Sequence, residues 1–405
     1  MSGLLGEWLT TFQLLHPFNH SPNNPLIHST PLRVALVINT SWNIWNFRRG
    51  LVRALQAAGH EVLAVAPPDE YSGRLATELG CRYVPVLMEN KGTNPIKDGQ
   101  LLRRFAAIYR REKPDVVLHF TIKPNIYGTL AARLAGVPCI NNVSGLGTVF
   151  IVENLVSKVA RGLYRLAFRF PHKVFFQNND DRELFIRYGL VKPALTGLVP
   201  GSGVDLARFK PEPAQQPANV PFTFLMVARV LYEKGIVEYF EAARQVRAAL
   251  GQEQVRLQLL GGLDEAGGVG VPRATFEQWL AEGHVEYLGT SDNVAAHLHR
   301  ADCVVLPSYR EGTPKTLLEA AACGKPLVTT DVPGCRETVQ NGHNGYLCQV
   351  RSADDLAAKL LQVARLPAER LATMGEASRQ LAEEKFDEKL VLREYLTAVA
   401  EAGER

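Results

Sequence analysis

The chain repeats one alternation twice: short apolar runs are separated by longer segments with helical periodicity. In the first half the apolar runs lie at residues 33–38, 61–66, 82–86 and 115–120. The pattern restarts further on, with runs at 222–227, 255–261, 285–288, 303–307, 326–330 and 345–348. Strands separated by helices of about 10–15 residues are typical of right-handed βαβ units and parallel sheets. The sequence therefore predicts an α/β fold with two parallel sheets.

A stretch rich in glycine and proline, residues 196–221, separates the two series of strands and is the best candidate linker. We predict an extension over 1–30, an N-terminal domain over 31–200 and a C-terminal domain over 201–385. Residues 386–405 form a final helix that is expected to pack back on the N-terminal domain. The absence of an apolar run of about 18 residues predicts no transmembrane helix, and the first residues lack the basic start of a signal peptide.

Six cysteines are scattered without a CxxC pair, so we expect reduced, buried thiols in a cytosolic protein and no structural zinc site.

Charge is distributed unevenly along the chain. Residues 1–200 hold 23 Lys/Arg against 13 Asp/Glu, and the excess is concentrated in 97–173, with 13 basic and 4 acidic side chains. This asymmetry favours a polyanionic partner of the first half, either nucleic acid or an anionic membrane.

Two glutamates with seven residues between them, Glu311 and Glu319, follow the apolar run at 303–309. Thr313 and Pro314 fit the N-cap and first position of a helix that starts there. A helix N-terminus at the carboxyl end of a parallel strand favours anions. The two carboxylates suit sugar hydroxyls, so an elongated ligand fits, with a sugar at Glu311, a diphosphate on the helix end and a ribose at Glu319.

Arg229 and Lys234 lie in the predicted first turn after the strand at 222–227. In α/β sheets this turn often holds phosphates, and two cations five residues apart suit a diphosphate. Taken alone, the pair is better explained as two solvated surface charges. Together with Glu311 and Glu319, however, the two cations suit a binding site for a sugar diphosphate.

These features together resemble the retaining family 4 glycosyltransferases, which have the GT-B architecture of two facing Rossmann-like domains. The matching residues are Arg229, Lys234 and the pair Glu311 and Glu319, with two further motifs, GSGVDLARFKP (201–211) and DVPGCRETVQNGHNGYL (331–347). The similarity runs from residue 33 onward. TIKPNIYG (121–128), NNVSGLGTVF (141–150) and VFFQNNDD (174–181) are most similar to the subgroup that builds bacterial capsule, O-antigen and lipid-linked glycans.

The resemblance implies roles for individual residues. Arg229 and Lys234 are expected to hold the donor's pyrophosphate and to stabilise charge on the leaving group. Glu311 is expected to contact the donor sugar, and Glu319 the ribose. The backbone along the diphosphate and sugar is expected to come from Gly312, Thr313, Thr316 and Leu317. The family commonly needs no metal, and we predict neither a metal site nor a cofactor.

Two other segments allow more than one interpretation. The loop expected over Asn39–Asn46 lacks the glycines of many relatives, and its Trp42 and Trp45 suit either acceptor contact or packing between domains. His119 ends a predicted strand, where a sugar contact and a core histidine are about equally favoured.

Residues 154–170 have the pattern of a basic amphipathic helix. Lys158, Arg161, Arg165 and Arg169 recur at spacings of three and four, beside an apolar stripe of Val156, Val159, Leu163, Leu166 and Phe170. A basic amphipathic helix suits an anionic membrane surface, and an ordinary domain helix is the alternative.

We therefore predict a hexosyltransferase that moves a sugar from a UDP-sugar to a lipid-diphosphate-linked glycan, peripherally bound at the cytoplasmic face of the inner membrane. A nucleotide-sugar 2-epimerase shares the architecture and is the nearest alternative. A non-catalytic glycan- or nucleic-acid-binding protein would explain the basic half but not the glutamates, and we expect no nucleic-acid partner. No GxGxxG follows either first strand, which disfavours a dehydrogenase.

Overall fold

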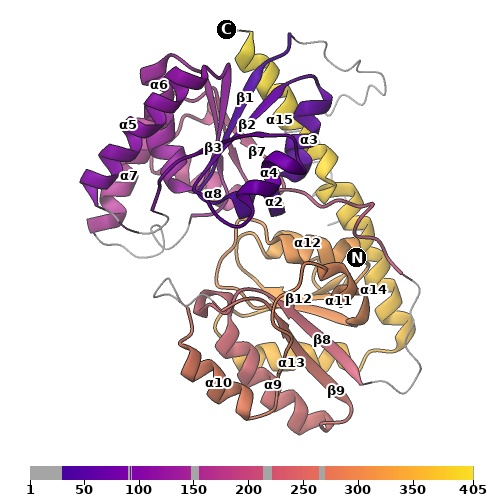
Figure 1. Cartoon of the computed structure of the whole chain (residues 1–405). Helices are drawn as coiled ribbons and strands as arrows, with labels where there is room; N and C mark the ends of the chain where they lie inside the picture. Colours follow the sequence, from indigo (N-terminus) through magenta and orange to yellow (C-terminus); the bar gives the residue numbers. More distant parts are fainter. Residues whose placement is uncertain are drawn as a thin grey trace.

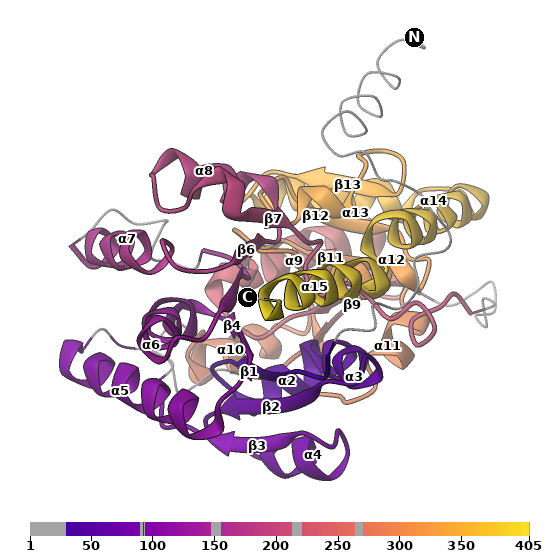
Figure 2. The ribbon, with the colours of Figure 1, turned by 90° about the horizontal axis from the view of Figure 1, so that it is seen from above.

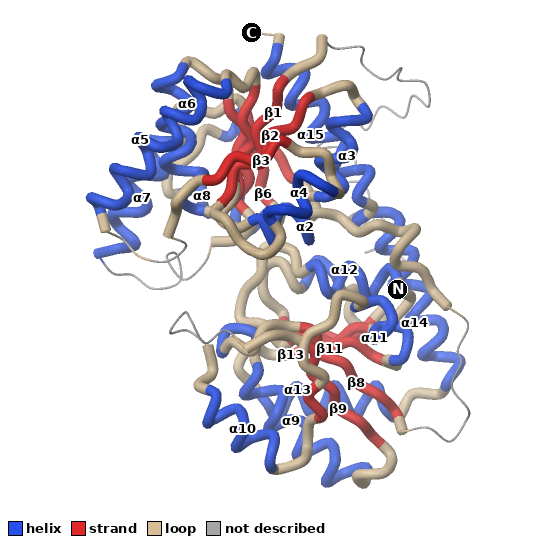
Figure 3. Tube along the Cα trace, viewed as in Figure 1, coloured by secondary structure: helices blue, strands red, loops and turns tan. Residues whose placement is uncertain are grey.

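The computed structural model describes residues 30–89, 92, 94–146, 155–212, 221–263 and 270–404. The predicted extension over 1–30 therefore lies outside the described residues except for its last position. Two α/β domains lie one above the other and face each other across a narrow junction (Figure 1). Each contains a sheet with helices on both faces (Figure 3), so the predicted two-domain α/β arrangement is confirmed.

The N-terminal sheet has the order β3-β2-β1-β4-β5-β6-β7, and every neighbouring pair is parallel. Its strands are β1 (Arg33–Val37), β2 (Glu61–Ala66), β3 (Arg82–Pro85), β4 (Val116–Phe120), β5 (Cys139–Val143), β6 (Lys173–Phe176) and β7 (Thr196–Leu198). Alternate side chains of β1 enter two different cores, with Leu36 on one face and Val37 on the other. Both faces are covered, so the strands are apolar throughout rather than alternating with polar residues.

Helices cover the two faces of this sheet in separate groups (Figure 2). One group comprises α5 (Pro95–Glu112), η1 (Pro124–Gly128), α6 (Thr129–Ala135), α7 (Leu155–Ala167) and α8 (Asn179–Arg187). The other comprises α2 (Ser41–Phe47), α3 (Arg49–Ala57), α4 (Ser72–Thr77) and, from the far end of the chain, α15 (Glu388–Gly403).

The C-terminal sheet has the order β10-β9-β8-β11-β12-β13 and is also parallel. Its strands are β8 (Phe222–Val227), β9 (Val255–Leu260), β10 (Glu286–Tyr287), β11 (Cys303–Leu306), β12 (Leu327–Thr330) and β13 (Gly345–Cys348). Its helices are α9 (Ile236–Leu250), α10 (Arg273–Ala281), α11 (Val294–Arg300), α12 (Lys315–Ala322), α13 (Ala353–Ala364) and α14 (Ala368–Leu381).

The chain crosses between the domains twice. The first crossing lies in the predicted linker, but that linker begins with a strand: β7 pairs in register with β6. The second crossing follows α14 and ends in α15, which runs along the N-terminal domain in Figure 1. Val391, Tyr395 and Val399 of α15 are buried in the same core as β1 and β4. Tyr395 packs against the rings of Phe120 and Phe175.

One local prediction was wrong. The segment Asn39–Asn46, expected to be a loop, forms most of helix α2, because Thr40 Oγ1 caps it by accepting from the Asn43 N–H at 3.1 Å. Arg48 separates α2 from α3, since it leaves helical geometry with φ −126° and ψ 6°.

Candidate active site

The loops that follow β8 and β11 lie side by side, because these two strands pair in the sheet although they are first and fourth in the domain. Ligands of open α/β sheets bind at such a reversal of strand order, outside the carboxyl ends of the strands. The loop after β8 carries Arg229 and Lys234, and the loop after β11 carries Glu311. The topology therefore brings together residues that are 77 positions apart.

Lys234 and Glu311 form a half-buried ion pair. Lys234 Nζ lies 2.5 Å from Glu311 Oε1, and the two side chains are 18% and 15% exposed. Ser308 Oγ donates to the same carboxylate oxygen at 2.7 Å. One oxygen of Glu311 thus has two donors, and an ammonium group has three hydrogens to give. The pair therefore keeps further hydrogen-bonding capacity for a ligand.

Gly235 allows the two loops to approach this closely. It follows Lys234 with φ 73°, in the left-handed region that favours glycine. A Cβ at this position would overlap the backbone carbonyl of Pro307, which precedes Ser308. Glycine is thus required here on both conformational and steric grounds.

Helix α12 begins at Lys315, one residue after the position expected from the sequence, with Pro314 as its N-cap. Thr313 is not the cap, because its hydroxyl donates to Gln177 O of the other domain at 2.9 Å. Thr316 Oγ1 donates to Val227 O at 3.1 Å and ties the helix to the end of β8. The Leu317 N–H donates to Pro314 O at 3.0 Å, so within this conformation it is engaged inside the helix.

Glu319 lies on α12, apart from the Glu311 cluster, and is 12% exposed. Burial raises the pKa of the Glu319 carboxyl, and Lys315 and Arg208 oppose this shift. Lys315 Nζ is 3.9 Å from Glu319 Oε1 and donates to Asn46 O of the N-terminal domain at 2.5 Å. Burial lowers the pKa of Lys315, with Glu319 acting in the opposite direction. The two glutamates thus face different cations, as two parts of an elongated ligand would require.

Arg229 is exposed in the turn after β8. Gly261 at the end of β9 lies against this turn, where a Cβ would overlap the carbonyl of Ala228. Arg229 therefore projects from a closely packed backbone at the same edge of the sheet as Lys234.

His119 lies in the core of the N-terminal domain and is 0% exposed. Its Nδ1 is 2.9 Å from Asn141 Oδ1, an acceptor, so Nδ1 donates and Nε2 accepts from the Tyr109 hydroxyl at 2.9 Å. Burial lowers the pKa of His119 to about 4. This geometry favours the core histidine over the sugar contact.

The two tryptophans of α2 differ in exposure. Trp45 is buried in the N-terminal core beneath the guanidinium of Arg74, 4.1 Å from the ring centroid. Trp42 is 41% exposed and packs edge-on against Phe47. Phe47 in turn contacts Lys315 Nζ, 5.0 Å from its ring centroid. Only Trp42 is therefore placed to reach a ligand in this structure.

The four basic residues of the helix predicted over 154–170 have different environments, and Arg169 lies beyond the end of α7. Lys158, Arg165 and Arg169 are exposed, whereas Arg161 lies over the Tyr188 ring at 4.5 Å. Arg165 also donates to Tyr188 O at 2.9 Å. The core face of the segment is formed by other residues, Tyr164, Ala167 and Phe168. Three members of the expected apolar stripe face outward, since Val159 is 56%, Leu166 44% and Phe170 40% exposed. Leu163 instead packs against the core, and the side chain of Val156 lies outside the described residues.

Several residues of the site were not found from the sequence. Ser308, Arg310 and Lys315 have no recognisable spacing, although Arg310 directly precedes the glutamate motif and Lys315 lies inside it. Within the described ranges no group of three or more His, Cys, Asp or Glu side chains is arranged to hold a metal ion.

Comparison with known proteins assigns the chain and its fold to a family. A model described as "Glycosyl transferase 4-like domain" matches residues 44–201, and "Glycosyl transferases group 1" matches residues 209–381. The chain is a GT-B glycosyltransferase. The hexosyltransferase class predicted from the sequence is confirmed with it, and the second model contains Arg229, Lys234, Glu311 and Glu319.

This glycosyltransferase is similar over nearly its full length to a Campylobacter jejuni enzyme, N,N'-diacetylbacillosaminyl-diphospho-undecaprenol alpha-1,3-N-acetylgalactosaminyltransferase. The two are 29% identical over 380 residues, which is 90% of this chain and 97% of the relative. An Escherichia coli UDP-Gal:alpha-D-GlcNAc-diphosphoundecaprenol alpha-1,3-galactosyltransferase is 27% identical over 290 residues, 69% of this chain and 74% of the relative. Among solved structures, Anabaena Alr3699/HepE in complex with UDP and glucose has a TM-score of 0.75 and 18% identity, covering 91% of this chain and all of the other. This likeness supports the GT-B fold.

Proposed function

We propose that this glycosyltransferase moves a hexose or N-acetylhexosamine from a UDP-sugar to a glycan carried on an undecaprenyl-type lipid diphosphate, with retention of anomeric configuration. The reaction would contribute to bacterial surface glycan assembly. The observation that carries the proposal is the cluster of Lys234, Glu311 and Ser308 at the strand-order reversal. The names of the Campylobacter and Escherichia relatives support the acceptor class.

Donor binding follows from the charges of the cluster. Lys234 keeps hydrogens beyond the one given to Glu311, and Arg229 projects from the adjacent turn, so both suit a diphosphate. Glu311 retains a carboxylate oxygen for sugar hydroxyls. Glu319, about one turn into α12, suits the ribose. No metal is needed in this scheme, because the two cations offset the charge of the leaving group.

The transfer step breaks the bond between the donor's anomeric carbon and its phosphate oxygen. The acceptor hydroxyl oxygen forms the new bond on the same face, and its proton passes to the departing phosphate oxygen. Lys234 and Arg229 stabilise the negative charge that develops there. Glu311 positions the sugar and does not take the proton.

Acceptor binding is assigned to the N-terminal domain and to a membrane surface. Leu134 of α6, 59% exposed, adds to the exposed Val159, Leu166 and Phe170. The exposed cations beside them are Lys158, Arg165 and Arg169. An apolar face flanked by cations suits the interface of an anionic bilayer. Among the described helices, none is long and apolar enough to cross a membrane.

The test incubates the purified chain with bacterial membrane fractions and, separately, radiolabelled UDP-GalNAc, UDP-Gal, UDP-GlcNAc and UDP-Glc. We expect label from one donor to enter organic-extractable lipid. Glu311→Gln should lower turnover by about 100-fold, the loss of one positioned polar contact at the reacting sugar, with UDP affinity nearly unchanged. If no nucleotide sugar labels any lipid, the proposed acceptor is wrong.

A further inference from the structure

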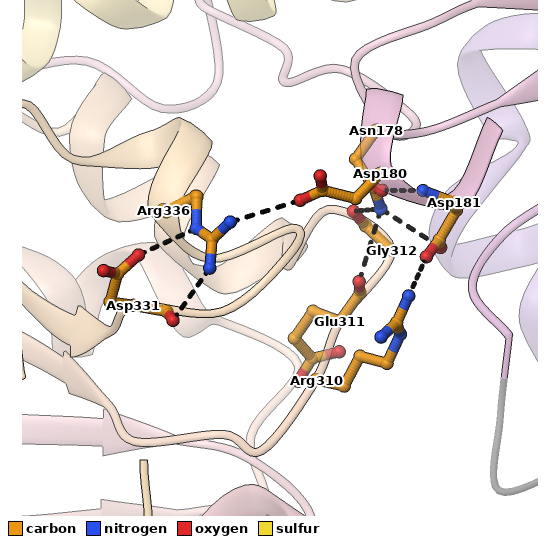
Figure 4. A network of polar contacts seen from close by, with 8 residues as sticks. All are labelled: Asn178, Asp180, Asp181, Arg310, Glu311, Gly312, Asp331 and Arg336. Atoms are coloured by element: carbon orange, nitrogen blue, oxygen red, sulfur yellow. Dashed lines mark hydrogen bonds and ion pairs between the residues drawn. The ribbon is translucent and has the colours of Figure 1, made fainter. Parts of the chain in front are cut away.

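The loop that carries Glu311 contacts the N-terminal domain at the start of α8. Asn178, the N-cap of α8, donates from Nδ2 to Gly312 O at 2.8 Å. Its Oδ1 accepts from the Asp181 N–H at 2.8 Å. Arg310, the residue before Glu311, forms an ion pair with Asp181. Figure 4 shows these side chains meeting between the two domains.

The loop and the N-terminal domain are also closely packed at this contact. Gly312 has no space for a side chain, because a Cβ would overlap Ser144 O and Gln177 Oε1 of the N-terminal domain. On its other side, a Cβ on Gly334 would overlap the carbonyls of Glu311 and Gly312. The loop is thus held between the N-terminal domain and residues 333–334, and its position depends on both domains.

Glu311 therefore receives its position from two sources. Its carboxylate is fixed within the C-terminal domain by Lys234 and Ser308. Its backbone is fixed by Arg310 and Gly312 on either side, whose partners Asp181 and Asn178 belong to the other domain. Separation of the domains would remove the second set of contacts and leave the first.

We propose that the Asp181–Arg310 pair is a closure latch that positions Glu311 for transfer. It forms only when the domains meet, so the donor sugar is held correctly only when the acceptor domain is in place. This inference rests on the proposed function, in which Glu311 contacts the donor sugar. Asp181 and Arg310 are positioning residues, since they act through the loop and not on substrate.

The energetics of a buried pair suit a reversible latch. Asp181 is completely buried and the Arg310 side chain is 25% exposed. Burial raises the pKa of Asp181, and Arg310 and Asn178 oppose that shift. Desolvation of such a pair offsets most of its attraction, so the intact pair adds little to closure. Removal of one partner leaves the other charge uncompensated and disfavours the closed state strongly.

The same interface provides a matched control. Asp180, the neighbour of Asp181, pairs with Arg336 across the domains at 3.3 Å, but the two side chains are 46% and 41% exposed. Arg336 also pairs with Asp331 of its own domain at 2.7 Å. An exposed pair contributes little. Asp180→Asn therefore removes a charge at the same interface without breaking the buried contact.

The experiment compares wild type, Asp181→Asn, Arg310→Met, Arg310→Lys and Asp180→Asn, all as the full chain. The donor is the UDP-sugar that the lipid-labelling assay identifies. With this donor, Asp181→Asn and Arg310→Met should lower kcat by about 100-fold while the Kd for UDP stays within about threefold. Arg310→Lys keeps the charge and should recover about tenfold of that loss. Asp180→Asn should stay within about threefold of wild type.

Small-angle scattering of the ligand-free proteins gives a readout that does not need the reaction. Asp181→Asn and Arg310→Met should have a larger radius of gyration than wild type, and Asp180→Asn should not. If the scattering and kcat of Asp181→Asn match those of Asp180→Asn, the latch is refuted. If wild type transfers no sugar but the scattering difference holds, the proposed function fails and the latch stands without its catalytic role. Arg310 is the more exposed partner of the pair, with its side chain 25% exposed, so Arg310→Met reports even if Asp181→Asn does not fold.

Discussion

Gly235→Ala tests whether the approach of the two active-site loops matters for catalysis. Gly235 has φ 73°, and a left-handed conformation costs a residue with a Cβ about 1–2 kcal/mol. The added Cβ would also overlap the Pro307 carbonyl. The overlapping atom is backbone and not a flexible side chain. The turn that carries Lys234 must therefore move by about 1 Å to reach an ordinary carbon–oxygen separation. Overpacking of this kind adds about 1–3 kcal/mol.

We therefore expect Gly235→Ala to lower the free energy of unfolding by about 2–5 kcal/mol. A shift of 1 Å at Lys234 should lower kcat by about 100-fold. Urea denaturation and the lipid-labelling assay measure the two effects. The control is Gly283→Ala, because Gly283 has φ 75° and its Cβ would meet no heavy atom of the described residues within 4 Å.

The Gly283→Ala control separates the cost of a left-handed backbone from the cost of steric overlap. Gly283→Ala should cost about 1–2 kcal/mol of stability and leave turnover unchanged. If Gly235→Ala behaves like Gly283→Ala in both assays, the close contact with Pro307 does not position Lys234, and the reasoning is refuted.

Three further predictions concern other parts of the molecule. Burial lowers the pKa of His119 from 6.5 to about 4, so the unfolded chain binds the proton at higher pH than the native chain. The resulting stability, about 3 kcal/mol, is present above pH 6.5 and is lost as the pH falls toward 4. Urea titrations should therefore show a flatter pH dependence for His119→Gln in that range, and an unchanged slope would contradict the assignment. Lys158→Gln and Arg169→Gln should each weaken binding to phosphatidylglycerol vesicles about fivefold, or about 1 kcal/mol, in sedimentation assays. Arg256→Gln, on the exposed side of β9, should have no effect, and equal losses at all three positions would exclude a specific surface. Lys234→Met should weaken UDP binding by at least tenfold in calorimetry, and unchanged affinity would remove Lys234 from the diphosphate site.

Much of the architecture was predictable, because it depends on local patterns. Strand positions follow from apolar runs such as 61–66 and 222–227, and two series of them predict two sheets. The break at Arg48 was not predictable, because residues 46–58 have continuous helical periodicity. The Thr40 cap is a local signal that sequence reasoning overlooked.

The candidate site divides in the same way. Glu311, Glu319 and Lys234 stand out through spacing and resemblance, and their pairing follows once the strand order is known. Thr313 was assigned as a helix cap on local grounds, but its hydroxyl is engaged by Gln177 of the other domain. Asp181 and Arg310 were missed for the same reason. Contacts between domains join segments 129 residues apart, and no local pattern records them.

The position of α15 has a consequence for biosynthesis. The core between β1 and α3 includes Val391, Tyr395 and Val399, which are synthesised after every strand of both sheets. During translation the first domain to emerge is therefore the last to be completed, and its apolar face stays uncovered until the C-terminal domain has been made. Vectorial folding of domain after domain, the usual order on the ribosome, is not available to this chain. Residues 31–200 expressed alone should aggregate, and a fused copy of residues 387–404 should rescue their solubility.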